Sequence, residues 1–309
     1  MQLLFLGTGA GVPAKHRNVS AIALKRLNKK GAIWLFDCGE ATQHQILHTV
    51  IKPRRIEKIF ITHLHGDHLF GLPGFLSSRS FQGGEDPLTV YGPKGIKAFI
   101  ETSLQVSSTH LKYQVEIVEV HDGMIIEDDE TQIEVGELDH AIQSFGYRIA
   151  EKDRPGELQA DRLMKLGIHP GPIYKKLKEK QIVEWNGMKL NGSDFLGEDK
   201  KGLIITVLGD TRLCNRSIEL AKDANLLVHE ATFERSSEKM AHEYYHSTTA
   251  QAAFVAQEAG AHELWISHIS SRYTEDDCER LAEEAKAIFP NSHLAHDFSE
   301  TSIVTRKNT

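Results

Sequence analysis

Short apolar runs alternate with turn residues along the chain, at the lengths typical of strands and helices in a layered protein. In the first half this pattern predicts strands over residues 3–6, 21–24, 32–36, 58–62 and 88–92 and helices over 41–48, 73–79 and 95–104. Residues 113–140 are typical of a meander of several strands. In the second half, strands over 203–208, 226–229 and 263–267 alternate with apolar-periodic helices such as 248–259. Two groups of strands separated by helices favour a layered α/β architecture.

The strand over residues 58–62 runs directly into a segment with four metal-ligand side chains in six positions, His63-Leu64-His65-Gly66-Asp67-His68. Imidazole nitrogens suit zinc, and a carboxylate among them favours a site that keeps a water molecule over a closed structural site. A single histidine on a strand is more often a core residue, but four ligand types at this spacing predict a metal centre. Such a cluster can hold two ions.

Three further residues of ligand type follow strand patterns at their carboxyl ends: His140, Asp210 and His268. Because strand ends in an α/β fold meet at one edge, we expect these side chains to converge on the cluster around Asp67. Each has an ordinary alternative by itself, since Asp210 could cap a helix and either histidine could lie on the surface. Together with the cluster, they complete the coordination of two ions.

Composition limits the class of protein. The chain has 309 residues, of which 40% are hydrophobic, enough for one large or two ordinary domains. A net charge of -7 is unlike that of a dedicated nucleic-acid binder, although a local basic patch stays compatible with it. The three cysteines are scattered and odd in number, which predicts neither disulfides nor a cysteine zinc site. With no apolar run of about twenty residues and no leader pattern, we expect a cytoplasmic protein without a membrane partner.

The ligand pattern of His63, His65, Asp67 and His68 with the later His140, Asp210 and His268 resembles that of the metallo-β-lactamase superfamily. Further motifs resemble those of the ribonuclease Z family: Pro13-Ala14-Lys15-His16-Arg17-Asn18, His229-Glu230-Ala231-Thr232 and His246-Ser247-Thr248. The resemblance spans nearly the whole chain, and three motifs in the right order are far more specific than the superfamily signature. It implies a single catalytic domain over residues 1–309, folded as a four-layer αββα sandwich with a protruding flexible arm.

The resemblance also implies a role for each site residue. His63, His65 and His140 would bind one zinc ion, and Asp67, His68 and His268 the other, with Asp210 bridging the two Zn2+ of each chain. Asp67 would also orient the attacking water, His246 would protonate the leaving ribose oxygen, and Glu230 would orient His246. Two alternatives stay open, because His246 could simply start a helix and Glu230 could support a zinc histidine. The RNA contacts implied are Lys15, Arg17, Asn18 and Arg272. For Arg17 and Arg272, a solvated surface position is nearly as good an explanation.

Residues 148–180 differ in composition from the rest of the chain. The segment contains nine lysines and arginines and five acidic residues, which gives it a net charge of +4 within an acidic protein. The centre of the segment, residues 167–172, is rich in glycine and proline, which excludes a helix or a central strand. A solvated insertion is the ordinary explanation. The resemblance implies instead an arm that grips tRNA through its phosphates, with contacts from Lys175, Lys176 and Lys178.

The function implied by the resemblance is that of a zinc-dependent endoribonuclease, a phosphodiester hydrolase. It would remove the 3′ trailer from precursor tRNA just after the discriminator nucleotide and leave a 3′-hydroxyl on the tRNA. The family is typically a homodimer in which the arm of one subunit presents tRNA to the site of the other. Two alternatives are a small-molecule hydrolase of the same fold, such as a lactonase or thioesterase, and a non-catalytic RNA-binding protein. The basic segment and the motif at 229–232 count against the first, and the seven intact ligand positions count against the second.

Overall fold

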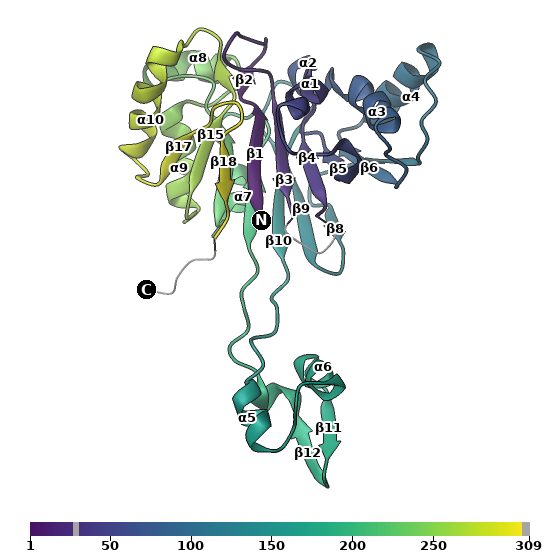
Figure 1. The fold of residues 1–309 in the computed structure, drawn as a ribbon. Helices are drawn as coiled ribbons and strands as arrows, with labels where there is room; N and C mark the ends of the chain where they lie inside the picture. Colours follow the sequence, from purple (N-terminus) through teal and green to yellow (C-terminus); the bar gives the residue numbers. More distant parts are fainter. Residues whose placement is uncertain (27–30, 305–309) are drawn as a thin grey trace.

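Two sheets packed face to face form the body of the molecule (Figure 1). The computed structural model describes residues 1–26 and 31–304, and within them each sheet has seven strands. In spatial order, the first sheet consists of β18 (Glu300–Ser302), β1 (Gln2–Gly7), β3 (Ala21–Lys25), β4 (Ile33–Phe36), β5 (Ile56–Phe60), β6 (Leu88–Gly92) and β7 (Val115–Glu119). The second consists of β17 (Ser292–Leu294), β15 (Leu264–Ser267), β14 (Leu226–Glu230), β13 (Ile204–Val207), β10 (Ser144–Glu151), β9 (Thr131–Leu138) and β8 (Ile125–Glu127).

Aromatic side chains fill the layer between the two sheets. The ring of Phe60 is fully buried and stacks on Phe36 and Tyr91, with centroids 5.1 and 5.0 Å away. From the facing sheet, Tyr147 packs on Phe60 at 5.1 Å, and its hydroxyl donates to the carbonyl of Ile61 over 2.7 Å. The buried phenol therefore has its hydrogen bond, and it ties the two sheets together just before the His63 segment.

Helices cover both outer faces of the sandwich (Figure 1). The first sheet packs against α1 (Thr42–Leu47), α3 (Leu72–Phe81) and α4 (Ile96–Val106), and the second against α7 (Asn215–Ala221), α9 (Thr249–Glu258) and α10 (Cys278–Lys286). Leucine, isoleucine, alanine and phenylalanine side chains form a separate core on each side. The four-layer αββα architecture is confirmed. Among the described residues, every helix is too short or too polar to span a lipid bilayer.

The strands and helices predicted from the apolar pattern are present, with ends that differ by one or two residues in most cases. The pattern missed β10, although Phe145, Tyr147 and Ile149 alternate along it and are all buried. It also missed β17 and β18, which have three residues each and gain their backbone hydrogen bonds only by pairing with β15 and β1. Strands this short are determined by their neighbours rather than by their own sequence.

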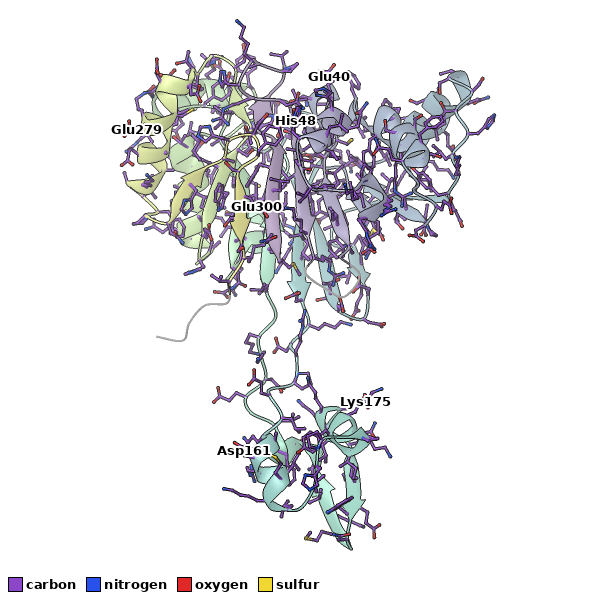
Figure 2. All side chains as sticks on the ribbon, in the orientation of Figure 1. Glu40, His48, Asp161, Lys175, Glu279 and Glu300 are labelled. Atoms are coloured by element: carbon purple, nitrogen blue, oxygen red, sulfur yellow. The ribbon has the colours of Figure 1, made fainter. Side chains whose placement is uncertain are left out.

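A small separate unit projects from one end of the body on two extended chain segments (Figure 1). It comprises residues 152–202, between β10 and β13, and is called the arm below. Its elements are α5 (Ala160–Lys165), α6 (Pro172–Lys178), β11 (Ile182–Trp185), β12 (Met188–Asn191) and a 3-10 turn over Gly192–Phe195. The arm has its own core of buried side chains, made of Leu163, Ile168, Leu177, Leu190 and Phe195. Figure 2 shows Asp161 and Lys175 on the arm, well away from Glu279 and Glu300 of the body.

The predicted boundaries of the arm, 148–180, are wrong at both ends. Arg148 belongs to β10, and its guanidinium donates to the carbonyls of Leu220 and Lys222 in the body over 2.8 and 2.6 Å. At the other end, the β11–β12 hairpin and the following turn continue the unit to residue 202. The excess of basic residues did not locate the end of the arm, because the hairpin contributes apolar residues such as Leu190 to the core of the arm.

Replacing Phe60 with alanine tests the role of the aromatic layer. Because the ring is fully buried among four other aromatic rings, Phe60→Ala should lower the free energy of unfolding by about 3–5 kcal/mol, measured by chemical denaturation. Phe81, which is 81% exposed at the end of α3, is the matched control. Phe81→Ala should change stability by no more than about 0.5 kcal/mol. Equal losses in the two variants would contradict this account of the core.

Candidate active site

The seven predicted metal ligands lie together at one edge of the sandwich, where strands of both sheets end. His63 and His65 follow β5, and Asp67 and His68 lie in the short helix α2 (Gly66–Leu69). The other three ligands follow strands of the second sheet: His140 after β9, Asp210 after β13 and His268 after β15. These three strands run in the same direction, so their carboxyl ends share the edge as the sequence predicted.

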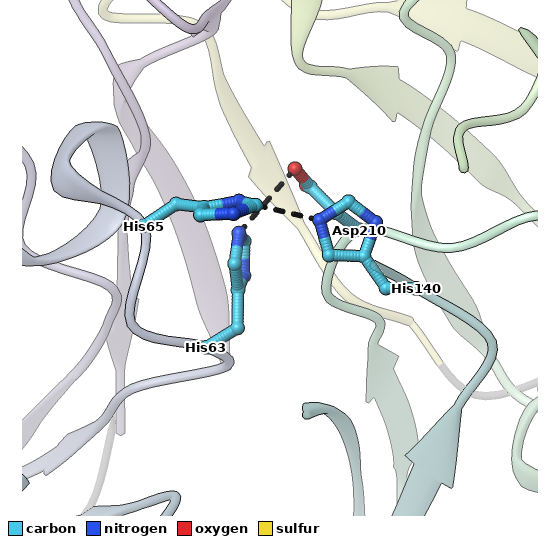
Figure 3. Close-up of side chains that lie close together, drawn as sticks. All are labelled: His63, His65, His140 and Asp210. Carbon is cyan, nitrogen blue, oxygen red and sulfur yellow. Dashed lines mark hydrogen bonds and ion pairs between the residues drawn. The ribbon is translucent and has the colours of Figure 1, made fainter. Parts of the chain in front are cut away.

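One group of ligands combines His63, His65, His140 and Asp210, whose ligand atoms all lie within 4.8 Å of one another (Figure 3). Nε2 of His63 is 3.5 Å from a carboxylate oxygen of Asp210, and Nε2 of His140 is 3.3 Å from Nδ1 of His65. Nε2 of His63 is also buried and has no hydrogen-bond partner among the described residues. A buried nitrogen without a partner is costly, and a metal ion at this point would satisfy it.

A second group combines Asp67, His68 and His268 beside the first. Nε2 of His268 lies 3.1 Å from Nε2 of His68 and 3.3 Å from a carboxylate oxygen of Asp67. Asp210 stands between the groups, since one carboxylate oxygen is 3.5 Å from His68 and the other is 3.3 Å from His268 and 3.5 Å from His63. This is the placement that a bridging carboxylate requires.

Hydrogen bonds on the far side of each ring aim the remaining nitrogen at the centre. Nδ1 of His68 donates to Asp37 over 2.7 Å, and Nδ1 of His140 donates to the carbonyl of Tyr245 over 2.8 Å. Nδ1 of His63 bonds the Thr62 hydroxyl at 3.0 Å, and Nδ1 of His268 bonds the Thr232 hydroxyl at 2.9 Å. Such outer partners set the tautomer and orientation of ligand histidines. The donor set therefore fits a divalent metal centre.

The protonation states of the site residues also favour binding of a divalent metal. Burial and the neighbouring His68 lower the pKa of His63 well below its usual value, which keeps that imidazole neutral and able to bind a metal. Burial by itself would raise the pKa of Asp67, but His268 and His68 outweigh it and lower the pKa. In the same way, burial opposes ionisation of Asp210, while His268, His68 and His63 hold its pKa well below the usual range. Ionised carboxylates among imidazoles are a suitable donor set for a divalent cation.

Asp37, at the end of β4, was not predicted to belong to the site. Its carboxylate accepts hydrogen bonds from His68, from the backbone N–H of Thr62 and from the Thr62 hydroxyl. It thereby links α2 to the end of β5. Asp37 holds a φ of 57°, in the left-handed region, so the fold keeps an unfavourable backbone conformation at this point. The available signal in the sequence was a carboxylate directly after a predicted strand, the same signal that identified Asp210.

His246 and Glu230 form a pair next to the metal ligands. Nδ1 of His246 lies 2.9 Å from Glu230, whose buried carboxylate also accepts hydrogen bonds from the backbone N–H groups of Thr211, Thr232 and Ser247. Burial lowers the pKa of His246, but Glu230 outweighs it and raises that pKa to about 9. With Nδ1 engaged by Glu230, Nε2 is the nitrogen that can meet a substrate.

The alternative role for His246, that it starts a helix, is filled by a different residue, Thr248. Thr248 caps α9, because its hydroxyl accepts from the backbone N–H of Gln251 and the Gln251 side chain accepts in return from the backbone N–H of Thr248. His246 instead lines a cavity of about 240 Å³ beside the metal ligands. The cavity also includes Asp67, Asp210 and Arg272 in its wall.

Four predicted RNA contacts come from the loop after β2 (Gly9–Ala10) and the segment after β16 (Ile269–Ser270), and they have different surroundings. Lys15 is exposed, and Arg272 lines the cavity. Arg17 is only 3% exposed, and its guanidinium donates to the Thr8 hydroxyl and to the carbonyl of Ala295, both over 2.6 Å. The predicted phosphate contact of Arg17 is therefore wrong, since this side chain anchors the loop inside the protein. Asn18 also acts internally, because its amide donates to the carbonyl of Glu40 over 2.8 Å.

Comparison with known proteins decides the family. A family model described as anti-Pycsar protein Apyc1 matches residues 1–152, a range that includes four ligands of the His63 to His68 segment and His140 but stops before Asp210. A ribonuclease Z of Geobacillus kaustophilus is 58% identical over 304 residues, covering 98% of this chain and 99% of that protein. The chain belongs to the ribonuclease Z family. This confirms the family resemblance, and it makes the protein a phosphodiester hydrolase of the endoribonuclease class.

Other relatives agree with this assignment. A ribonuclease Z of Bacillus cereus strain AH187 is 60% identical over 299 residues, covering 96% of this chain and 97% of that protein. Among solved structures, the human short-form tRNase Z superposes with a TM-score of 0.72 at 31% identity, covering 99% of this chain and all of that one. The metallo-β-lactamase fold protein YhfI of Bacillus subtilis matches with a TM-score of 0.66 at 19% identity over 97% of this chain and 98% of that one, which supports the fold alone.

Asp37→Asn tests the newly identified support of His68. The amide has about the size of the carboxylate but carries no charge, so the hydrogen bond from His68 becomes weaker. We expect the affinity for divalent metal to fall roughly tenfold to hundredfold, measured by competition with a chromogenic chelator. Asp122→Asn, a change at an exposed carboxylate of the body, is the control and should leave metal affinity unchanged. Unchanged affinity in Asp37→Asn would refute the role assigned to Asp37.

Proposed function

We propose that the protein is a zinc-dependent endoribonuclease that removes the 3′ trailer of precursor tRNA just after the discriminator nucleotide. The observation that carries this proposal is the combination, in a member of the ribonuclease Z family, of seven convergent ligand side chains with the His246–Glu230 pair. Part of this site lines one cavity: His65, Asp67, Asp210, His246 and His268. A metal centre alone would suit many hydrolases of the fold. The adjacent acid is what a poor ribose leaving group needs.

Two zinc ions per chain account for the ligand arrangement. His63, His65 and His140 would hold one ion, and Asp67, His68 and His268 the other, with Asp210 shared by both. Bound cations would supply a water deprotonated near neutral pH and would stabilise the negative charge that grows on the phosphate oxygens. Asp67 is held in place for orienting the attacking water, because one of its oxygens accepts from the backbone N–H of Gly11 over 2.7 Å.

His246 then completes the reaction at the other end of the scissile bond. Nε2 gives its proton to the 3′-oxygen of the ribose on the tRNA side, so that the tRNA leaves with a 3′-hydroxyl. Glu230 holds the ring through Nδ1 and stabilises the charged imidazolium before transfer. Because Glu230 is itself fixed by three backbone N–H groups, the ring has one orientation relative to the metal ligands.

Incubation of the purified protein with a precursor tRNA, followed by sequencing of both product ends, tests this proposal. We expect one cut after the discriminator, with a 3′-hydroxyl on the tRNA. Metal analysis of the same preparation should give about two zinc ions per chain. Intact precursor after incubation with the zinc-loaded protein would refute the proposed activity. Full activity with one ion per chain would refute the shared role of Asp210.

His246→Ala tests the acid. Cleavage of precursor tRNA should slow roughly a hundredfold or more, because the ribose oxygen is a poor leaving group without a proton. Hydrolysis of a nitrophenyl phosphodiester should slow much less, since nitrophenolate leaves without protonation. Glu230→Gln should show the same division between the two substrates, to a smaller extent. If both substrates slowed equally in His246→Ala, His246 could not be the proton donor.

The arm is proposed to bind tRNA phosphates away from the cleavage site. It carries eleven lysines and arginines against eight acidic residues, a net charge of +3 in a chain of net charge -7. Lys175, Lys176 and Lys178 are exposed on α6. In Figure 1 the arm leaves the body at the end opposite α2, which carries two of the metal ligands. A tRNA held by the arm therefore has to bridge a long distance to reach a catalytic site.

Deleting the arm separates binding from chemistry. Joining Glu151 to Leu203 with a short Gly-Ser linker should leave the body folded, because β10 and β13 are already antiparallel neighbours. Hydrolysis of the nitrophenyl phosphodiester should persist while cleavage of precursor tRNA collapses through weaker binding. The slope of log affinity against log salt should also flatten by a few units, since several phosphate contacts are lost. Unaltered tRNA affinity and salt dependence would show that the arm is a solvated insertion.

A homodimer is the second part of this proposal. Three large apolar side chains are between 59% and 80% exposed near α1 and α2: Leu47 at the end of α1, Val50 in the loop after it, and Phe70 directly after α2. Large apolar side chains left exposed in this way can form part of an interaction site. A second copy on this face would allow the arm of one subunit to present tRNA to the site of the other. Sedimentation of the protein at micromolar concentration should therefore give the mass of a dimer.

A further inference from the structure

An aromatic wall borders the active-site cavity next to His246. Phe233 follows β14 and is 4% exposed, whereas Tyr244, at the end of α8 (Glu238–Glu243), is 63% exposed. Both residues line the cavity that contains Asp67 and Asp210. The two rings have centroids 6.4 Å apart and planes inclined by 30°. An isolated exposed tyrosine is ordinary, but the ring of Tyr244 lies against the buried ring of Phe233 at the edge of this site.

The backbone holds Tyr244 and His246 in a fixed relation. The N–H of Tyr244 donates to Met240 and that of His246 donates to Ala241, so both residues are fastened to α8. Tyr245 between them has a φ of 61°, in the left-handed region. This reversal of the chain lets two residues only two positions apart both reach the cavity.

Phe233 is also held by backbone hydrogen bonds to the segment after His246, and its ring forms the buried part of the wall. Its N–H donates to the carbonyl of Ser247, and its own carbonyl accepts from the N–H of Thr249. The guanidinium of Arg272 lies over its ring, 4.9 Å from the centroid. Phe233 is thus covered by Arg272 and supports the wall from behind. Tyr244 is the ring that remains open to a ligand.

The chemistry of the neighbouring residues identifies what such a ring would meet. His246 gives its proton to the 3′-oxygen of the ribose that stays on the tRNA. The base attached to that same ribose must therefore lie near His246, and Tyr244 is the exposed ring that lines the same cavity. An unpaired base needs a flat apolar surface when it leaves water, and a tyrosine ring supplies one for any base.

We propose that Tyr244, supported by Phe233, is a stacking platform for the base of the last nucleotide retained on the tRNA. This inference rests on the proposed cleavage of precursor tRNA. Stacking on one ring fixes the ribose beside His246 without reading a particular base. It therefore predicts cleavage after any of the four nucleotides, with purines favoured over pyrimidines because their larger rings stack more strongly.

The test is a double-mutant cycle under single-turnover conditions. The substrates are a precursor tRNA and the same RNA with an abasic residue as the last retained nucleotide. Tyr244→Ala should lower kcat/KM for the intact RNA roughly tenfold to hundredfold, and removal of the base should cost the parent enzyme a similar factor. The variant should lose little more on the abasic RNA, because the same stack cannot be lost twice. Tyr244→Phe keeps the ring and should stay within about threefold of the parent.

Phe254→Ala is the matched control, since Phe254 is 40% exposed on α9 and does not line the cavity. It should cleave both RNAs at the parent rates, and circular dichroism with metal analysis should show all variants folded and loaded. Independent, multiplying losses from Tyr244→Ala and from the abasic residue would overturn the platform. A loss in Tyr244→Phe as large as in Tyr244→Ala would do the same, by assigning the effect to the hydroxyl. Failure of the parent protein to cut intact precursor would instead refute the proposed function on which the inference rests.

Discussion

The structure depends on the position of one carboxylate, that of Asp210. It is 3% exposed, and the imidazoles of His63, His68 and His268, from two distant parts of the chain, lie within 3.5 Å of it. A buried carboxylate without compensating positive charge would cost several kcal/mol, so the imidazoles and the cations they can hold are required for this site to be stable. This requirement forces the ends of β5, β13 and β15 to meet at one point. The packing of the two sheets through Phe60 and Tyr147 makes that meeting possible.

Around this centre, several residues adopt unfavourable backbone conformations that orient their side chains. Asp37 and His268 both have a φ of 57°, and Tyr245 has a φ of 61°. Asp37 supports His68, His268 is itself a predicted ligand, and the carbonyl of Tyr245 supports His140. Unfavourable backbone conformations gathered at one place indicate that the surrounding packing determines them. The result is a set of ring nitrogens that already point to a common centre, which lowers the cost of binding metal.

In the proposed function, the body would carry out the chemistry and the arm would recognise the substrate. The body presents two ionised carboxylates, Asp67 and Asp210, among five histidines, a donor set suited to cations. The arm has the opposite net charge and a core of its own, so it can contact RNA without disturbing the catalytic edge. Recognition by charge and shape suits a substrate class with a common form and many sequences. The aromatic wall near His246 fits the same principle, because a ring stacks on any base.

The sequence by itself determined the chemistry of the protein and most of its strands. His63, His65, Asp67 and His68 are close in the chain, and the apolar patterns that form β5, β13 and β15 place the remaining ligands at strand ends, so local spacing was enough to predict them. Only the tertiary structure decided what distant segments do to one another. Arg17 is buried because Thr8 and Ala295 surround its guanidinium. Asp37 supports the metal ligand His68 because α2 lies next to the end of β4. The limits of the arm and the role of Tyr244 depend in the same way on contacts between residues far apart in the chain, or on a single left-handed residue, and neither leaves a periodic signal in the sequence.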